Sequence, residues 1–274
     1  MKRSRLPGRV LQSLAALFLY APILVLIVFS FNSTKSRVKF DGFTLDWYVK
    51  LFSDSQVLSA LYLTLVLAVL SALIATVIGT VSAIGLYQMK QRPRKMLLAL
   101  NNVPVVNPDI ITGVSLMLVF VLCVTFLRQL GLNAGLGFTT LLIAHVTFNI
   151  PYVILSVLPK LRQLSKHTYE AALDLGANPF LAYRRVILPE IMPGVVSGAM
   201  IAFTMSIDDF LISYFTTGTS VQTLPMVIYA MTRKRVSPEI NALSTLMFFT
   251  VLSLLIVINL LQTRDQKRKE RRLS

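Results

Sequence analysis

The chain has 274 residues, of which 55% are hydrophobic and only 14% are charged, and its mean hydropathy is +0.69. Soluble domains carry about 25% charged residues, so this composition excludes an ordinary soluble protein. The net charge of +15 does not imply a nucleic-acid partner, because Lys and Arg gather in polar segments between apolar runs, as in inner-membrane proteins. The single cysteine, Cys123, excludes a disulfide within the chain.

Apolar runs of about 20 residues recur and predict an all-α integral membrane protein, with residues 1–274 forming one transmembrane domain. A basic start followed by an apolar run is also typical of a signal peptide. The length of this run, Pro22 within it and the missing small-residue cleavage site favour a retained first span. The six expected spans are about 10–31, 57–87, 96–127, 138–158, 194–217 and 241–261.

Two of these spans have unusual compositions. The second is rich in Ala, Gly, Ser and Thr, which predicts close packing inside a bundle. The third is interrupted by Pro104 and Pro108, and its segment Asn107-Pro108-Asp109 is polar at membrane depth. A broken helix is tolerated there only where it is buried in protein or lines a wet cavity, so this break is either structural or functional.

The distribution of basic residues predicts an orientation. With both chain ends in the cytoplasm, inner segments hold 19 of the 27 Lys and Arg residues and outer segments hold eight. This excess follows the positive-inside rule. The cluster Arg233-Lys234-Arg235 falls outside, in a longer loop where the rule is weaker. We therefore expect a multi-pass protein of the bacterial inner membrane with both termini cytoplasmic.

Residues 163–190 form a polar segment between two spans that predicts two helices joined by a tight turn. Gly176 supplies the left-handed conformation that ends the first helix. Asn178 is a good N-cap for the second, and Pro179 suits its first position. We expect this second helix to run through Val186. Two prolines limit its extension, Pro189 and Pro193.

Within this segment the chain resembles the EAA signature of membrane subunits of bacterial ABC importers. Val186 stands where the signature usually has Ile. The resemblance implies a type I importer permease in which this segment is a cytoplasmic coupling helix that docks into a cleft of an ATPase subunit. It implies that these residues serve the contact with the ATPase and are not catalytic. The matching residues are Glu170, Ala171, Ala172, Gly176, Leu188 and Pro189.

The resemblance extends over nearly the whole chain to permeases of polyamine importers, which carry spermidine or putrescine. Its motifs are Ser-Ile-Asp-Asp-Phe at residues 206–210 and Ser-Pro-Glu-Ile-Asn-Ala-Leu at residues 237–243. It implies that the chain works with a second, different permease subunit, an ATPase dimer and a periplasmic binding protein. ATP and Mg would bind to the ATPase, and this chain would bind no cofactor.

Three carboxylates lie inside expected spans: Asp109, Asp208 and Asp209. A charge at membrane depth costs about 2.5 kcal/mol or more, so such residues normally face a cavity or a partner. No Lys or Arg lies in the spans to pair with them. This favours a polycationic substrate whose amines supply the missing charges. Structural roles are the alternatives: hydrogen bonds to backbone freed at a helix break, or a salt bridge to a partner subunit.

The positions of the three acids allow a common site. Counted from the cytoplasmic end, Asp109 and Asp208 each lie about 20 Å into their spans. Asp208 and Asp209 are neighbours, so both face one pathway only if the helix unwinds locally. Ser206 adds a hydroxyl on the same span.

Two aromatic residues are further candidates for the substrate pathway, and two polar residues of the fourth span have an expected structural role. Trp47 and Tyr48 could make cation–π contacts with an arriving polyamine. For Trp47, the only tryptophan, the alternative is an anchor at the membrane interface. His145 and Asn149 lie one helical turn apart and are expected to form hydrogen bonds between spans.

The sequence shows no P-loop, metal-ligand spacing or nucleophile elbow, so we expect no catalytic and no metal-binding residue. We predict the permease subunit of an ATP-driven polyamine importer in contact with membrane lipid. The alternatives are a permease for another solute, such as ferric iron or an organic anion, and a membrane scaffold or intramembrane enzyme. Membrane acids without a membrane base disfavour the anion.

Overall fold

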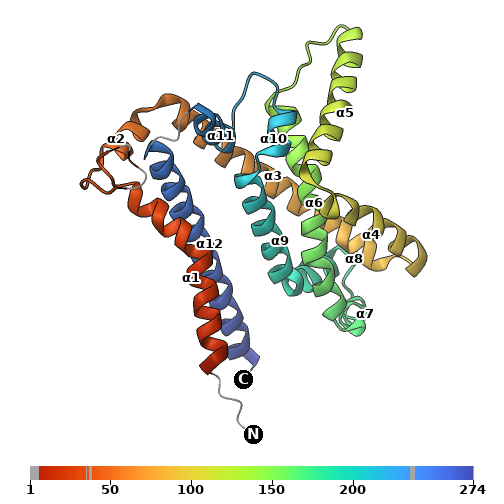
Figure 1. The fold of residues 1–274 in the computed structure, drawn as a ribbon. Helices are drawn as coiled ribbons and strands as arrows, with labels where there is room; N and C mark the ends of the chain where they lie inside the picture. The colour runs from red at the N-terminus through yellow and green to blue at the C-terminus, as the bar shows by residue number, and fades with distance from the viewer. Residues whose placement is uncertain (1–5, 35, 37–38, 235–237, 274) are drawn as a thin grey trace. The chain divides into compact units, whose positions relative to one another are not determined.

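The computed structural model describes residues 6–34, 36, 39–234 and 238–273, and its elements are helices (Figure 1). Within this described part, β pairing is limited to one isolated bridge between Asn32 and Phe43. The chain divides into two compact units, residues 1–58 with 228–274 and residues 59–227. Ser237, which begins the second motif, and the chain ends at residues 1 and 274 lie outside the described residues.

The first unit contains α1 (Leu6–Phe29), α2 (Asp46–Ser53) and α12 (Pro238–Leu273), and the first two pack against α12. Helices α1 and α12 run side by side in opposite directions, so the start of α1 and the end of α12 lie at the same end of this unit (Figure 1). Helix α11 (Leu224–Lys234) spans the division between the units.

The core of the second unit is made by three long helices, α3 (Ser55–Gln88), α6 (Phe138–Gln163) and α9 (Leu188–Asp208). Glycines of α3 and α9 approach the same residue of α6. A Cβ on Gly79 would lie 2.7 Å from the Val153 Cβ, and one on Gly198 would lie 3.1 Å from the Val153 Cα. The close packing predicted from the small residues of the second span is therefore confirmed.

Five stretches of the described chain are helical, long and apolar enough to cross a membrane. They correspond to the first five expected spans and comprise residues 11–29, 55–88, 109–129, 138–163 and 179–208. The sixth expected span, 241–261, lies within α12, a single helix of 36 residues. The all-helical membrane fold is therefore confirmed, with boundaries that differ from the prediction at two places.

The first difference is in the third expected span, 96–127, which is two helices and not one interrupted helix. Helix α4 (Gln91–Val106) ends before Asn107, whose backbone is extended at φ −77° and ψ 138°, and α5 (Asp109–Gln129) begins after Pro108. Proline disfavours the helical conformation of the residue before it, which explains the position of the break. Asp109 is thus the first residue of a span, and not about 20 Å inside one as expected from the sequence.

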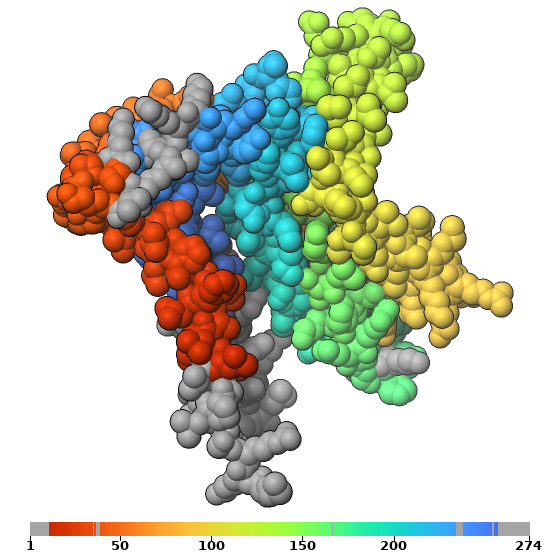
Figure 2. All heavy atoms as spheres, in the orientation of Figure 1, coloured from red at the N-terminus to blue at the C-terminus, as the bar shows by residue number. Residues whose placement is uncertain are grey.

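None of the residues of helix α4 is buried. It packs against α6 within the second unit, and the space-filling view shows most of its surface standing clear of that unit (Figure 2). Only α5 of this pair is long and apolar enough to be a membrane span.

The second difference concerns the fifth expected span, 194–217. Helical structure runs without interruption from Pro179 to Asp208, through α8 (Pro179–Ala182), the π-helix η1 (Tyr183–Ile187) and α9. It breaks at Asp209-Phe210 before α10 (Leu211–Thr216). The expectation that two prolines limit the helix was wrong for Pro189 and Pro193, which both lie inside α9.

The π turn provides the physical reason for the tolerance of the first of these prolines. The N–H of Leu188 donates to the carbonyl of Tyr183, five residues earlier, which is the hydrogen-bond spacing of a π-helix. The next residue is Pro189, which has no N–H to donate. The wider turn thus absorbs the change in hydrogen bonding, and the helix continues.

Candidate functional site

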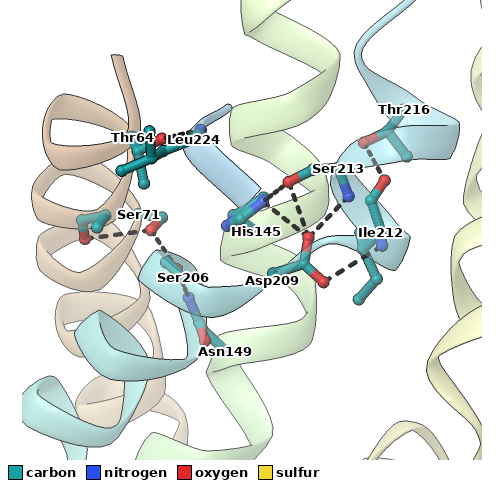
Figure 3. Close-up of polar contacts among 11 residues, drawn as sticks. Thr64, Ser71, His145, Asn149, Ser206, Asp209, Ile212, Ser213, Thr216 and Leu224 are labelled. Atoms are coloured by element: carbon teal, nitrogen blue, oxygen red, sulfur yellow. Dashed lines mark hydrogen bonds and ion pairs between the residues drawn. The ribbon is translucent and has the colours of Figure 1, made fainter. Parts of the chain in front are cut away.

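Asp209 lies at the break between α9 and α10, and its carboxylate caps the first turn of α10 (Figure 3). One oxygen accepts a hydrogen bond from the Ile212 N–H at 3.2 Å. The other accepts from the Ser213 N–H at 2.7 Å and from the Ser213 hydroxyl at 2.8 Å. Asp209 therefore makes the contacts expected of a structural role, the alternative to substrate binding, because it accepts hydrogen bonds from backbone N–H groups at a helix break.

His145 of α6 completes this cluster from the neighbouring helix. Its Nε2 lies 3.5 Å from the Asp209 carboxylate and 3.1 Å from the Ser213 hydroxyl (Figure 3). The His145 side chain is 0% exposed and the Asp209 side chain is 9% exposed. The predicted hydrogen bonding of His145 between spans is therefore confirmed.

Asp208 and Asp109 occupy the ends of two different helices. Asp208 is the last residue of α9, Asp109 is the first residue of α5, and both are exposed on this chain. The Asp208 carboxylate is close enough to those of Asp109 and Asp209 to interact electrostatically with each of them. The fold thus gathers the three membrane acids that the sequence singled out, at two helix breaks, and the local unwinding that a shared site required is present.

The surroundings of these acids suit a cation. Neither Asp109 nor Asp208 forms an ion pair with any Lys, Arg or His in the described part of the chain. The half-buried Tyr152 of α6 is within electrostatic range of Asp109 and adds a phenol to the group. Two carboxylates without a cationic partner, at neighbouring helix ends, can pair with a ligand that carries more than one amine.

Ser206 has a different environment from the acids that follow it. It is 2% exposed, its hydroxyl lies 2.9 Å from the Ser71 hydroxyl, and it accepts a hydrogen bond from the Asn149 side-chain amide at 2.8 Å (Figure 3). These contacts join α3, α6 and α9, so Ser206 serves as a link between helices in this conformation. The predicted hydrogen bond of Asn149 between spans is confirmed.

Trp47 and Tyr48 belong to the first unit, whereas the acids belong to the second. Trp47 is buried, and its indole N–H donates to the carbonyl of Asn32 at 2.7 Å. The Lys50 ammonium lies 4.8 Å from the centre of the Trp47 ring, so this ring already has a cation from its own helix. The Tyr48 hydroxyl lies 2.7 Å from the Ser30 hydroxyl. Both aromatic residues thus hold the loop between α1 and α2 in place.

The predicted turn of the coupling region is confirmed in its hydrogen bonds. Helix α7 (Lys166–Asp174) is closed by Gly176, two residues after its last residue, with a φ of +84°. The N–H of Gly176 donates to the Leu173 carbonyl, and that of Ala177 donates to the Ala172 carbonyl. These two bonds define a Schellman motif. The Asn178 side chain then accepts from the Leu181 N–H at 2.8 Å, as an N-cap does.

The residues of the EAA signature divide between an inner and an outer face. Ala172 is buried, and Leu188 packs on the core of the second unit. Glu170, Ala171, Gly176 and Pro189 are exposed, and Glu170 lies 3.2 Å from the exposed His167. Two apolar residues that the motif did not single out are also exposed beside the turn, Leu175 at 90% and Phe180 at 73%.

Two residues beside the three acids were not identified from the sequence: Ser213, which bonds Asp209, and Tyr152, which lies near Asp109. For Ser213 a signal existed, because an Asp just before a short apolar helix is a common cap and its acceptors reach the backbone three and four residues on. Tyr152 gave no signal, since its place depends on how α6 packs. Among the described residues no group of three or more His, Cys, Asp or Glu could hold a metal ion.

Comparison with known proteins identifies relatives of the whole chain. Residues 75–271 match the family model described as binding-protein-dependent transport system inner membrane component. The spermidine/putrescine transport system permease protein PotC of Escherichia coli K12 is 41% identical over 88% of this chain and 87% of its own length. The putrescine transport system permease protein PotI of the same strain is 38% identical over 97% of this chain and 95% of its own length.

Solved structures share the fold at lower sequence identity. The chain is similar to a bacterial ABC transporter involved in the import of the acidic polysaccharide alginate, with a TM-score of 0.74 and 18% identity over 94% of this chain and 95% of that one. An amino acid ABC transporter crystallised with histidines gives a TM-score of 0.55 and 22% identity over 81% of this chain and 99% of that one. These similarities concern the arrangement of helices.

Proposed function

We propose, from the premise that this chain belongs to the family of binding-protein-dependent transport system inner membrane components, that it is a permease subunit of an ATP-driven polyamine importer. The family makes it a multi-pass transport protein of the inner membrane. Its relatives named for spermidine and putrescine transport support the substrate class.

The observation that carries the substrate class is the gathering of Asp109, Asp208 and Asp209 at two helix breaks. Asp109 and Asp208 are the groups that contact the amines, because both are exposed and have no ion pair among the described residues. Hydrogen bonds between charged groups contribute about 1.5–3 kcal/mol, so two such pairs are enough to favour a diamine over a monoamine. The same pair of carboxylates repels an organic anion.

The turn at 176–178 supports a docking role for the coupling region. Its two helices are fixed by the Schellman motif and the Asn178 cap, and the apolar side chains of Leu175 and Phe180 are exposed beside it. Exposed apolar residues on a rigid turn are suited to insertion into a cleft of a partner protein. The partner proposed here is the ATPase, which binds ATP and Mg.

The proposed complex contains this chain, a second permease subunit, an ATPase dimer and a periplasmic binding protein. Closure of the ATPases would displace the coupling region and switch the spans between outward-facing and inward-facing states. The antiparallel packing of α1 and α12 supports placing both termini on one side, and the excess of Lys and Arg in the inner segments supports the cytoplasm.

The test is uptake of labelled putrescine and spermidine by cells that lack their own polyamine importers and express this chain with its partner subunits. We expect ATP-dependent uptake that unlabelled polyamine abolishes. Ferric iron and citrate, supplied in the same cells, test the alternative solutes. Uptake of either of these without polyamine uptake would refute the proposed substrate class.

A further inference from the structure

Two adjacent aspartates at one helix break have opposite environments. Asp208 is exposed at the end of α9, whereas the Asp209 side chain is 9% exposed and bonded to α10 and α6. Asp209 has an extended backbone at φ −64° and ψ 123°, so the chain changes direction at this residue. Asp208, the last residue of α9, is therefore joined directly to a residue that two neighbouring helices hold in place.

We propose that His145 and Ser213 are positioning residues for transport: with Asp209 they form a buried latch that fixes this break and thereby orients Asp208. The latch is defined as these three side chains. Its role in uptake rests on the proposed function, but its structural effect can be measured without transport. Asp208 contacts the substrate, and the latch acts through Asp208.

The contacts of His145 support a dedicated role. Its ring lies on the face of α6 toward α10 and contacts Ser213 and Asp209 through Nε2, while its Nδ1 has no hydrogen-bond partner in the described part of the chain. A fully buried polar ring with one unsatisfied nitrogen is less favourable than a leucine of similar size, unless its remaining contacts are needed. Its hydrogen bond is with Ser213 and its ion-pair contact is with Asp209.

The latch also holds the second carboxylate, through helix packing. Ser213 is in α10, and α10 packs along α5. Gly113 of α5 fits closely against α10, since a Cβ there would lie 3.0 Å from the Phe215 ring and 3.3 Å from the Leu211 carbonyl oxygen. Gly113 is one helical turn from Asp109, the first residue of α5. A fixed α10 therefore fixes the start of α5 as well.

The kinetic test compares His145→Leu with Asn149→Leu, a matched control one turn along the same helix. Asn149 is equally buried but bonds Ser206 and does not contact the latch. At equal membrane abundance we expect His145→Leu to raise the apparent KM for putrescine by about threefold or more, as for residues coupled in one hydrogen-bond network. Asn149→Leu should leave KM within that limit, and His145→Gln, whose amide can replace Nε2, should restore it.

Combining His145→Leu with Asp208→Asn distinguishes a positioning role of His145 from a general effect on stability. If His145 acts through Asp208, most of the KM effect of His145→Leu is lost in an Asp208→Asn background, because only the path through α5 and Asp109 remains. An equal effect in both backgrounds, or no effect in either, overturns the proposal.

A labelling experiment covers the case in which transport fails altogether. In a Cys123→Ser background, the rate at which a cationic methanethiosulfonate reagent modifies Asp208→Cys reports the direction of that position. We expect His145→Leu to change this rate by about threefold or more, and to leave the exposed control Ser220→Cys unchanged. A smaller change at position 208 overturns the latch. Absence of polyamine uptake by the wild type, with the labelling effect present, refutes only the proposed substrate.

Discussion

Asp208 and Asp209 show that neighbouring acids of one sequence motif can have separate tasks. The sequence pointed to both as membrane carboxylates without a basic partner. The structure gives Asp209 four hydrogen-bond and ion-pair contacts from two helices and leaves Asp208 exposed. The difference depends on the backbone direction at the break, which periodicity alone does not determine.

At the scale of single residues, the first prediction concerns the charges of Asp208 and Asp109. Asp208→Asn and Asp109→Asn keep the shape of the side chain and remove its charge, so each should raise the apparent KM for putrescine by about tenfold to a hundredfold, equivalent to about 1.5–3 kcal/mol. The measurement is initial uptake rate against concentration at equal membrane abundance. Asp46→Asn, which neutralises an exposed acid in α2, is the control. Unchanged KM in the double Asp109/Asp208 variant would show that these acids are structural.

The second prediction concerns Gly176, whose φ of +84° lies in the left-handed region. A Cβ at this position would meet no atom within 4 Å, so any effect of substitution is conformational. Gly176→Ala should destabilise the turn by about 1 kcal/mol and weaken copurification of the ATPase, whereas Gly176→Asn, which tolerates this conformation, should cost less. Equal copurification with both variants would contradict a requirement for this turn geometry.

At the scale of elements, local signals were reliable, whereas the two prolines within α9 were misleading. The turn at 176–178 was predictable because a glycine, an Asn cap and a Pro at N1 each act within one turn of backbone. Pro189 and Pro193 were misleading because their effect depends on whether neighbouring turns can rearrange. For Pro189 the π turn at 183–187 supplies that rearrangement, and no single residue type predicts such a turn.

The sequence identified the acids of the candidate site but not the contacts that hold them in place. Acids in apolar runs are identifiable by their cost in a membrane. Which of them is held by His145 and Ser213 depends on the packing of α6 against α10, a contact between residues 68 positions apart in the sequence. Such contacts leave no local pattern.

The third prediction concerns the packing of α3 on α6. Gly79→Ala places a Cβ at 2.7 Å from the Val153 Cβ, so the helices must separate, and we expect a loss of about 1–3 kcal/mol in stability. Gly85→Ala on the same helix is the control, because no atom lies within 4 Å of its added Cβ. Thermal unfolding in detergent should show a lower midpoint for the first variant only. Equal midpoints would mean that α3 does not pack on α6 in this way.

At the scale of the whole molecule, the fourth prediction concerns orientation. A reporter fused after Ser274 should behave as cytoplasmic, and one inserted near Ser220 should behave as external. The reason is the excess of Lys and Arg in the proposed inner segments. Paired alkaline phosphatase and fluorescent-protein fusions measure this directly, since each is active on one side only. The reverse pattern would show that the basic cluster at 233–235 outweighs the other segments.

The uninterrupted helical run from Pro179 to Asp208 limits which sequence changes this chain can accept during evolution. It joins the exposed Phe180 at one end to Asp208 at the other. The angle between these two side chains about the helix axis is therefore set by the number of residues between them. Each residue added or removed rotates one end by about 100°. Substitutions along this run are therefore tolerable where packing allows. A single-residue insertion or deletion would instead change the angle between the proposed substrate contact at Asp208 and the proposed ATPase contact at Phe180. The π turn already contains one such extra residue, so it contributes to the angle at which the two ends of the helix face.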